Sequence, residues 1–401
     1  MPRLLIINQY FASREATGQL LLELTEHLAD EFAVTVVAEP PRALADETVA
    51  PDPRLTVVRV PAASFSRSSL LGRAANYASF LTRLPLSAWR TGPTDVVFCL
   101  TDPPVVGLVA LAIAKLRGAP LVLGCQDVHP QLGQVTGLLD QRVIFAVLRR
   151  AQRVLLSRAD HVVAIGHKMR RVLVGLGADE DRVRVIPNWT DTALIRPAPR
   201  PTAWAREHAL DGHFVVMHAG NVGQLQGLET ALEAARRLPQ IRLLIVGDGS
   251  GRPALMELAA RRGITNVRFV PWQPHNRMGE VLSSADAQLV CLMPGLAGLL
   301  EPSKFYGVLA AGTPVLVALD DDSEGAIVAR RERCGVAVAP GDAEALADAI
   351  AGLAALPDAE RAAMGERGRV YAELHGDRRA AAAAYADLFR SVLRPSAARR
   401  S

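Results

Sequence analysis

Short apolar, β-branched segments alternate with helix-forming segments along almost the whole chain, and this alternation limits the folds that the chain can adopt. Continuous apolar runs of about five residues are typical of strands buried on both faces, which occur in parallel sheets. Parallel strands need a long crossover between them, usually a helix, and segments of suitable length separate these runs. The chain is therefore predicted to be an α/β protein with doubly wound parallel sheets.

The predicted strands fall into two groups. The first group comprises residues 4–8, 34–38, 57–60, 96–100, 121–125, 161–165 and 183–186, and the second comprises residues 214–219, 243–247, 267–270, 287–291, 314–317 and 336–339. A chain of 401 residues suits two domains at roughly 100–200 residues per domain. Each group is expected to form one Rossmann-like domain.

A Pro- and Arg-rich stretch separates the two groups. Residues 196–201 read Arg-Pro-Ala-Pro-Arg-Pro, a composition that favours an extended linker and a hinge. Domains are therefore predicted over residues 1–187 and 202–377, with the linker over 188–201. Residues 378–401 are expected to form a final helix with a frayed end.

Two observations bear on the surroundings of the protein. The chain has no apolar run near the ~20 residues that span a bilayer, and its N-terminal apolar stretch is too short for a signal peptide, so a cytoplasmic location is expected. The four cysteines lie far apart without Cys-x-x-Cys spacing, which argues against a disulfide framework or a zinc knuckle. No metal site is predicted.

Positive charge is concentrated in one part of the chain. Residues 51–175 contain 16 Lys or Arg and 6 Asp or Glu, although the whole chain carries a formal net charge of only +4. The surplus falls on two amphipathic stretches, 67–90 and 142–158, which could lie on an anionic membrane surface. The alternative is that their Arg side chains are solvated and their apolar stripes pack into the core. With few aromatic residues and no recognised binding motif there, a nucleic acid partner is not expected.

Glycines follow several predicted strands at the turn into the next helix. Backbone N–H groups at such turns can bind an anion, and glycine allows close approach; a plain strand-to-helix turn is the alternative. The candidate anion-binding residues are Gly18 in the first domain and Gly220, Asn221, Gly223 and Gln226 in the second. Gly247 and Gly249 form a further turn after a strand, which could pass beneath a nucleoside. Because the chain has neither a Gly-x-Gly-x-x-Gly nor a Lys-Ser/Thr phosphate loop here, a dinucleotide enzyme or an NTPase is less favoured.

The most specific motif is Glu301-Pro302-Ser303-Lys304, which precedes a helix expected to end at Gly312. Ser303 and Lys304 then lie near the positive end of that helix, where phosphate binds. Arginine accounts for 42 of the 45 basic residues, so a lysine at this position indicates a need for a compact ammonium. A solvated lysine is the alternative.

In this order and spacing, the motifs resemble those of glycosyltransferase family 4 (group 1), particularly the bacterial sugar transferases of colanic acid, O-antigen and capsule assembly. The matching segments are Asn8-Gln9-Tyr10 to Gly18-Gln19-Leu20, Gln126-Asp127-Val128-His129-Pro130, Ile186-Pro187-Asn188, Gly220-Asn221 to Gly227-Leu228, and Pro302-Ser303-Lys304 to Gly312-x-Pro314-Val315.

The resemblance implies a GT-B fold, in which two Rossmann-like domains face each other across a cleft. It also implies a retaining transferase that uses a nucleotide-diphosphate sugar with no metal or other cofactor. The C-terminal domain would hold the donor and the N-terminal domain the acceptor, and the last helix would cross back to the first domain.

The chain departs from the pattern of many relatives. Asn221 and Gln226 stand where those relatives carry Arg and Lys, which leaves Lys304 as the main cation for the diphosphate. Gly307 stands at the position of the ribose-binding glutamate, and Glu301 is a candidate replacement for its partner glutamate. On the acceptor side, Gln126 replaces a histidine.

For catalysis, Asp127 is a candidate to accept the proton of the acceptor hydroxyl, and His129 is the alternative acceptor. Asp127 could instead cap a turn before Pro130. His161 and His218, at predicted strand ends, are expected to be structural.

The predicted function is sugar transfer from a UDP- or GDP-sugar to a lipid-linked or growing glycan at the inner face of the cytoplasmic membrane. A nucleotide-sugar epimerase on the same fold is one alternative. A catalytically silent GT-B partner subunit is another, since a glutamate and the Arg–Lys pair are missing.

Overall fold

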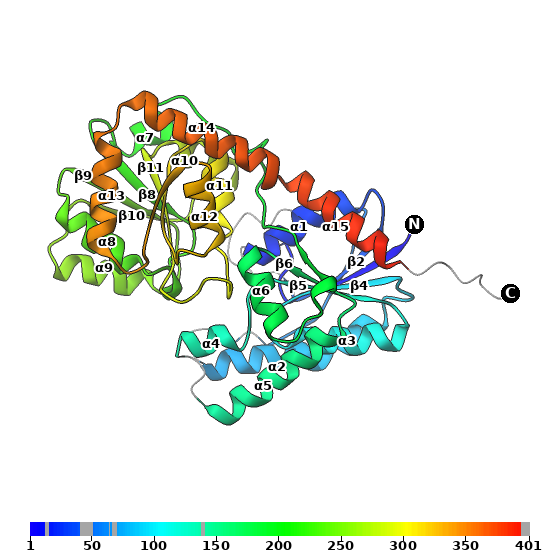
Figure 1. Ribbon diagram of the computed structural model, residues 1–401. Helices are drawn as coiled ribbons and strands as arrows, with labels where there is room; N and C mark the ends of the chain where they lie inside the picture. The colour runs from blue at the N-terminus through cyan, green and yellow to red at the C-terminus, as the bar shows by residue number, and fades with distance from the viewer. Residues whose placement is uncertain (13–15, 41–50, 64, 66–69, 138–140, 394–401) are drawn as a thin grey trace. The chain divides into compact units, whose positions relative to one another are not determined.

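The computed structural model describes residues 1–12, 16–40, 51–63, 65, 70–137 and 141–393. Residues 67–69 of the first predicted basic stretch and residues 394–401 lie outside this part. The chain forms two compact units (Figure 1). Unit 1 comprises Met1–Pro187, Gly298–Leu300 and Arg378–Ser401, and unit 2 comprises Asn188–Ala297 and Glu301–Asp377.

Unit 1 contains a parallel sheet of seven strands among its described residues, in the order β3-β2-β1-β4-β5-β6-β7. Its strands are β1 (Arg3–Ile7), β2 (Ala33–Ala38), β3 (Thr56–Arg59), β4 (Val96–Leu100), β5 (Leu121–Cys125), β6 (His161–Ala164) and β7 (Val183–Val185). Its helices are α1 (Ala16–Leu28), α2 (Leu70–Trp89), α3 (Val106–Arg117), α4 (Gln131–Val135), α5 (Arg142–Arg158), α6 (His167–Gly175), the 3-10 turn η1 (Glu180–Arg182) and α15 (Arg378–Val392).

Helix α15, the last of the chain, is part of the core of unit 1. It packs beside α1, whereas α2, α3 and α5 cover the other face of the sheet (Figure 1). Its Tyr385 and Phe389 rings lie 5.4 and 5.3 Å from the ring of Phe98 in β4, and all three side chains are fully buried. Aromatic contacts of this kind add to the burial of apolar area, so α15 stabilises unit 1 directly.

Unit 2 contains a parallel sheet of six strands in the order β10-β9-β8-β11-β12-β13. Its strands are β8 (Phe214–Ala219), β9 (Ile241–Val246), β10 (Val267–Val270), β11 (Ala287–Cys291), β12 (Val315–Ala318) and β13 (Gly335–Val338). Its helices are α7 (Ala203–Glu207), η2 (Gln224–Gln226), α8 (Leu228–Arg237), α9 (Arg252–Arg261), η3 (His275–Arg277), α10 (Met278–Ser283), α11 (Lys304–Ala310), α12 (Glu324–Arg331), α13 (Ala343–Ala355) and α14 (Asp358–His375).

Both sheets have the predicted doubly wound topology. Every predicted strand is present, and the ends differ from the predicted ones by at most two residues. The strand order reverses between β1 and β4 in unit 1 and between β8 and β11 in unit 2. In open α/β sheets, ligands bind at the carboxyl ends of the strands beside such a reversal.

The segment predicted as an extended linker, 188–201, lies within unit 2. The guanidinium of Arg369 in α14 donates hydrogen bonds to the carbonyls of Thr192 at 2.9 Å and Ile195 at 2.6 Å. It also donates to the carbonyl of Ala310 in α11 at 2.7 Å. One partly buried guanidinium therefore joins the first part of the segment to two helices. The hinge role of 188–201 stays a prediction.

Within the described part of the chain, no helix combines the length and the apolar character needed to cross a membrane.

Candidate functional site

The loops after β8 and β9 meet the start of α11 at the strand-order reversal of unit 2. Lys304 is the first residue of α11, and its Nζ lies 2.9 Å from Nε2 of His218, near the end of β8. A Cβ placed on Gly220 would lie 3.5 Å from the same Nζ. Lys304 and Gly220 therefore lie together. His218, expected to be structural, is a direct partner of Lys304.

Burial sets the charges of this pair. Desolvation, followed by the charge of Lys304, holds the pKa of His218 well below its usual range, so the imidazole is neutral at pH 7. Desolvation also lowers the pKa of Lys304 to about 8. Nε2 of His218 lies 2.9 Å from the Lys304 ammonium and 3.3 Å from the carbonyl oxygen of Asn221, and in the tautomer with its hydrogen on Nδ1 it accepts a hydrogen bond from the ammonium. The result is a positioned ammonium in a poorly hydrated place, which an anion would stabilise.

This pKa leads to a pH-dependent prediction. Lys304 is mostly protonated below pH 8 and neutral above it, so the affinity of the protein for UDP or GDP should fall by about tenfold from pH 7 to pH 9. The terminal phosphate of UDP or GDP loses its last proton near pH 6, below the range from pH 7 to pH 9. Isothermal titration calorimetry measures the profile. In Lys304→Met the affinity should be low and independent of pH, and an unchanged pH dependence in that variant would assign the titration to another group.

Two glycines bring the loops into close contact. Gly247, after β9, has φ +132°, and a Cβ on it would lie 2.0 Å from the carbonyl oxygen of Gly220. Gly249 has no room for a side chain either, because its Cβ would lie 2.5 Å from the carbonyl oxygen of Val222. No L side chain fits at such distances without a shift of the backbone. The two glycines therefore shape the loop that carries Asn221 and Gly220.

Gly247→Ala is expected to lower the free energy of unfolding of unit 2 by about 3 kcal/mol or more, from the combined positive φ and steric clash. Gly352→Ala in α13 is the matched control, because nothing lies within 4 Å of its Cβ and alanine favours a helix. The control should gain about 0.5–1 kcal/mol. Urea unfolding of the two variants and the wild type measures both changes.

Most backbone N–H groups of the loop after β8, residues 220–223, donate hydrogen bonds within unit 2. Gly220 donates to the carbonyl of Val246 and Val222 to that of Asp248, each at 2.9 Å. Gly223 donates to Oε1 of Gln226 at 2.9 Å. Of the four N–H groups from 220 to 223, only that of Asn221 has no acceptor among the described residues. The N–H of Asn221 is thus left without an acceptor among the described residues, and Gly223 and Gln226 hold the loop together.

The remaining candidates of unit 2 lie at the start of α11. Ser303 is the residue before the helix, and its side chain forms no capping hydrogen bond, so its hydroxyl is not used to hold the helix end. Glu301 is half-buried two residues earlier. Gly307 is buried inside α11, and a Cβ on it would lie 3.6 Å from the side chain of Ile195.

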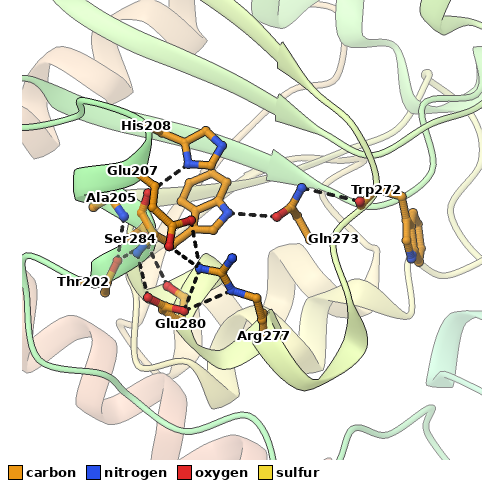
Figure 2. A network of polar contacts seen from close by, with 10 residues as sticks. Thr202, Ala205, Glu207, His208, Trp272, Gln273, Arg277, Glu280 and Ser284 are labelled. Atoms are coloured by element: carbon orange, nitrogen blue, oxygen red, sulfur yellow. Dashed lines mark hydrogen bonds and ion pairs between the residues drawn. The ribbon is translucent and has the colours of Figure 1, made fainter. Parts of the chain in front are cut away.

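A polar network near the carboxyl end of β10 holds the loop that follows this strand (Figure 2). The indole of Trp204 donates to Oε1 of Gln273 at 2.9 Å. The amide of Gln273 in turn donates to the carbonyl of Pro271 at 3.0 Å and to that of Trp272 at 3.4 Å, the second of which Figure 2 shows. Because Gly247 N donates to the carbonyl of Val270 at 2.9 Å, this loop begins directly beside the Gly247 turn. The network leaves the side chain of Trp272 43% exposed.

The acceptor-side candidates follow β5 in unit 1. The N–H groups of Gln126 and Asp127 donate to the hydroxyl of Thr101 at 3.2 and 3.3 Å. Thr101 directly follows β4, the neighbouring strand, and was missed in the sequence because a single threonine after a strand carries no signal. Val128 N donates to the carbonyl of Leu299 at 2.7 Å, which pairs this segment with residues 298–300 of the same unit.

Asp127 and His129 line one cavity and influence each other. Desolvation raises the pKa of Asp127, and the charge of His129 partly opposes this shift. Desolvation likewise lowers the pKa of His129, opposed by Asp127. Helix α4 begins after Pro130 and has no side-chain cap, so Asp127 does not act as its cap. A carboxylate with a raised pKa is a stronger base, which suits proton transfer.

Gly18 is the third residue of α1 in unit 1. Its N–H lies in the first turn, where the helix supplies no acceptor. The structure therefore brings most of the candidates together in two clusters, one in each unit. One cluster surrounds Lys304 in unit 2, and the other surrounds Asp127 in unit 1.

Both units match known protein families. Residues 16–189 match the glycosyl transferase 4-like domain, and residues 202–371 match the glycosyl transferases group 1. The chain is 29% identical over 313 residues to the putative colanic acid biosynthesis glycosyl transferase WcaI of Escherichia coli, covering 75% of this chain and 77% of that protein. It is 27% identical to the probable glycosyltransferase WbjE of Pseudomonas aeruginosa, covering 87% and 89%.

Among solved structures, Anabaena Alr3699/HepE in complex with UDP-glucose superimposes with a TM-score of 0.75 at 17% identity, covering 98% of this chain and 100% of that one. This likeness concerns the fold. The two domain matches, the two relatives and the shared fold agree with the motif order, and the chain belongs to the family 4 (group 1) glycosyltransferases of GT-B fold.

Proposed function

We propose that the protein transfers a sugar, with retention of anomeric configuration, from a UDP- or GDP-sugar to a lipid-linked or growing glycan in cell-surface polysaccharide synthesis. The observation that carries the proposal is the Lys304 ammonium, held by His218 over Gly220 in the domain that matches group 1. The name of WcaI refers to colanic acid, and HepE was solved with UDP-glucose, which supports this class of donor and product.

In the proposed reaction, the acceptor oxygen forms a bond to the anomeric carbon, the bond between the sugar and the diphosphate breaks, and negative charge develops on the leaving phosphate. Preorganised donors aimed at that charge stabilise the transition state. We assign this task to the ammonium of Lys304 and the N–H of Asn221, with the hydroxyl of Ser303 beside them. Asp127 accepts the proton of the acceptor hydroxyl, and no step requires a metal ion.

The test is release of UDP or GDP by the purified protein, supplied with a panel of nucleotide sugars and a lipid-linked glycan fraction. We expect release that needs both substrates and persists in EDTA, and NMR of the product should show the anomeric configuration of the donor. Conversion of the donor without an acceptor would indicate an epimerase. Binding of nucleotide without turnover across the panel would indicate a silent partner subunit.

We further propose that α5 places the enzyme at the inner face of the cytoplasmic membrane. The two basic helices differ in packing. In α2 the stripe of Phe80, Leu84 and Ala88 is fully buried, so this part of α2 packs into the core. In α5 only Leu155 and Leu156 are buried. Cosedimentation with phosphatidylglycerol vesicles, but not with phosphatidylcholine vesicles, is expected and should weaken at high salt.

A further inference from the structure

Three residues of the loop between β11 and α11 contact the segment that carries Asp127. These residues, Gly298-Leu299-Leu300, are called the loop tip. The loop tip belongs to unit 1, whereas the chain before Gly298 and after Leu300 belongs to unit 2. It contains no polar or charged side chain. The proposed proton transfer assigns no role to it.

Backbone contacts with two partners hold Asp127. Its N–H donates to the hydroxyl of Thr101, after β4, at 3.3 Å. Asp127 also pairs with Leu300 in an antiparallel bridge, and the N–H of Val128 donates to the carbonyl of Leu299 at 2.7 Å. Thr101 and the loop tip together therefore fix the backbone that carries the Asp127 carboxyl.

The bridge also brings two side chains next to each other. Residues directly opposite in an antiparallel pair have Cβ atoms about 4.5–5.5 Å apart, on the same face. The half-buried apolar side chain of Leu300 therefore lies beside the side chain of Asp127. An apolar neighbour takes water away from a carboxylate and makes its charged form less favourable.

The loop tip is itself tightly placed. Gly298 has φ +75°, and a Cβ on it would lie 2.6 Å from Cγ of Lys168 in α6 and 3.1 Å from the carbonyl carbon of the same lysine. A side chain at position 298 would therefore push the loop tip away from α6. On the unit 2 side, the carboxylate of Asp320 accepts hydrogen bonds from the N–H groups of Gly295 at 3.1 Å and Ala297 at 3.0 Å.

The loop tip acts on Asp127 without a charge of its own. The titratable side chains that line a cavity together with Asp127 are His129 and Cys125 of the same segment and Tyr77 of α2. Burial raises the pKa of Cys125 to about 12, so this thiol is neutral at pH 7. His129 is the group whose charge opposes the effect of burial on Asp127. Leu300 can therefore change the ionisation of Asp127 only by excluding water.

We propose that the loop tip positions the base of the transfer reaction: its backbone holds Asp127, and Leu300 shields the carboxyl from water. Leu299 and Leu300 are thus positioning residues, since they act through Asp127. This inference deepens the proposed function and rests on it for one point, namely that Asp127 is the base. Only three residues separate Leu300 from Lys304, so one loop carries both the support of the base and the ammonium assigned to the diphosphate.

The first test follows the ionisation of Asp127 without any substrate. Carbon-13 NMR of the full-length protein, labelled at its aspartate carboxyls, gives the titration curves, and the Asp127 signal is the one missing in Asp127→Asn. Because the loss of an apolar neighbour admits water, Asp127 should titrate at lower pH in Leu300→Ala than in the wild type. Leu300→Met keeps an apolar side chain and should titrate as the wild type does. Leu238→Ala, a half-buried leucine after α8 in unit 2, is the matched control and should leave the curve unchanged.

The second test follows the reaction. Gly298→Ala should displace the loop tip and lower kcat by about 10²-fold, the effect expected when a catalytic group moves by about 1 Å. In the Asp127→Asn background the same substitution should cause no further loss, because the loop tip acts through Asp127. Lys168→Ala removes the Cγ that the new Cβ would meet and should restore part of the activity. If Gly298→Ala does not fold by circular dichroism, Leu300→Ala takes its place, and its activity should fall on acidification at a lower pH than that of the wild type.

The proposal is overturned if Asp127 titrates equally in Leu300→Ala and the wild type, or if Leu300→Met moves the curve as far as Leu300→Ala does. It is also overturned if Gly298→Ala costs as much activity in the Asp127→Asn background as in the wild type. Failure of the proposed function gives a different result, in which Asp127 titrates as described but no nucleotide sugar is turned over. If sugar transfer occurs and the Asp127 titration does not respond to Leu300, only the role of the loop tip is lost.

Discussion

Replacing Lys304 by alanine should reduce donor-dependent release of UDP or GDP by about 10²–10³-fold, the usual effect of removing one preorganised donor at a developing negative charge. The reason lies in the geometry around Lys304. Its ammonium is fixed by His218 at 2.9 Å, and three of the four neighbouring loop amides already have acceptors. Little else in that loop can take over the task. Release is measured with saturating donor and acceptor.

Lys115→Ala is the matched control, because Lys115 is an exposed lysine of α3 in unit 1 and should leave release unchanged. Equal release by Lys304→Ala and the wild type would remove Lys304 from the mechanism.

The free energy of unfolding of the Lys304 variants shows whether a loss of activity comes from lost catalysis or from lost folding. The pKa of Lys304 is about 8 in the folded protein and near 10.5 when unfolded, so the unfolded state binds more protons between these values. Stability of the wild type should therefore rise with pH from about 8 to 10.5. Lys304→Met lacks this dependence and should be about 1–3 kcal/mol more stable at pH 7, because a buried charge is removed. Chemical unfolding at pH 7 and pH 10 measures both effects.

Asp127→Asn is expected to lower kcat by about 10²–10⁴-fold, the range found for removal of a general base. The affinity for the nucleotide should stay the same, since Asp127 lies in unit 1 and the donor candidates around Lys304 lie in unit 2. Because burial raises the pKa of Asp127, activity of the wild type should fall on acidification at a pH above the usual range of an aspartate. In Asp127→Asn, this fall of activity at acidic pH should disappear from the pH–activity profile.

His129→Gln distinguishes the two candidate bases. If Asp127 is the base, this variant keeps most of its activity and shifts the acidic limb to higher pH, because the charge of His129 lowers the pKa of Asp127. If His129→Gln loses as much activity as Asp127→Asn, or if the asparagine variant stays fully active, the assignment of Asp127 is wrong.

The strands could be predicted because each is a short apolar run between polar turns. That pattern reflects burial on both faces of a parallel sheet, and it is visible in the sequence. Lys304 could be found for a chemical reason, as one of three lysines among 45 basic residues and at the start of a helix. Such signals depend on the local sequence alone.

The partners of the site residues could not be predicted in the same way. The hydrogen bonds from the N–H groups of residues 126 and 127 to Thr101, and from Lys304 to His218, join strands and loops far apart in the chain. The two basic helices both have an amphipathic pattern, but their environments differ. Phe80 in α2 is fully buried, while Val147 in α5 is 62% exposed. Which apolar stripe faces the core depends on the neighbouring elements.

The hydrogen bonds from Arg369 to the carbonyls of Thr192 and Ile195 have a consequence for the design of chimeric proteins. A recombination breakpoint placed between residues 195 and 201 would take these carbonyl acceptors from one parent and the residue at position 369 from another, so the hydrogen bonds would form only where the second parent also has arginine there. Breakpoints just before Asn188 and just after Asp377 keep each unit intact, apart from residues 298–300, which pair with the segment after β5. Exchanging this block between homologous genes, with that tripeptide retained from the host, would show whether donor preference travels with it.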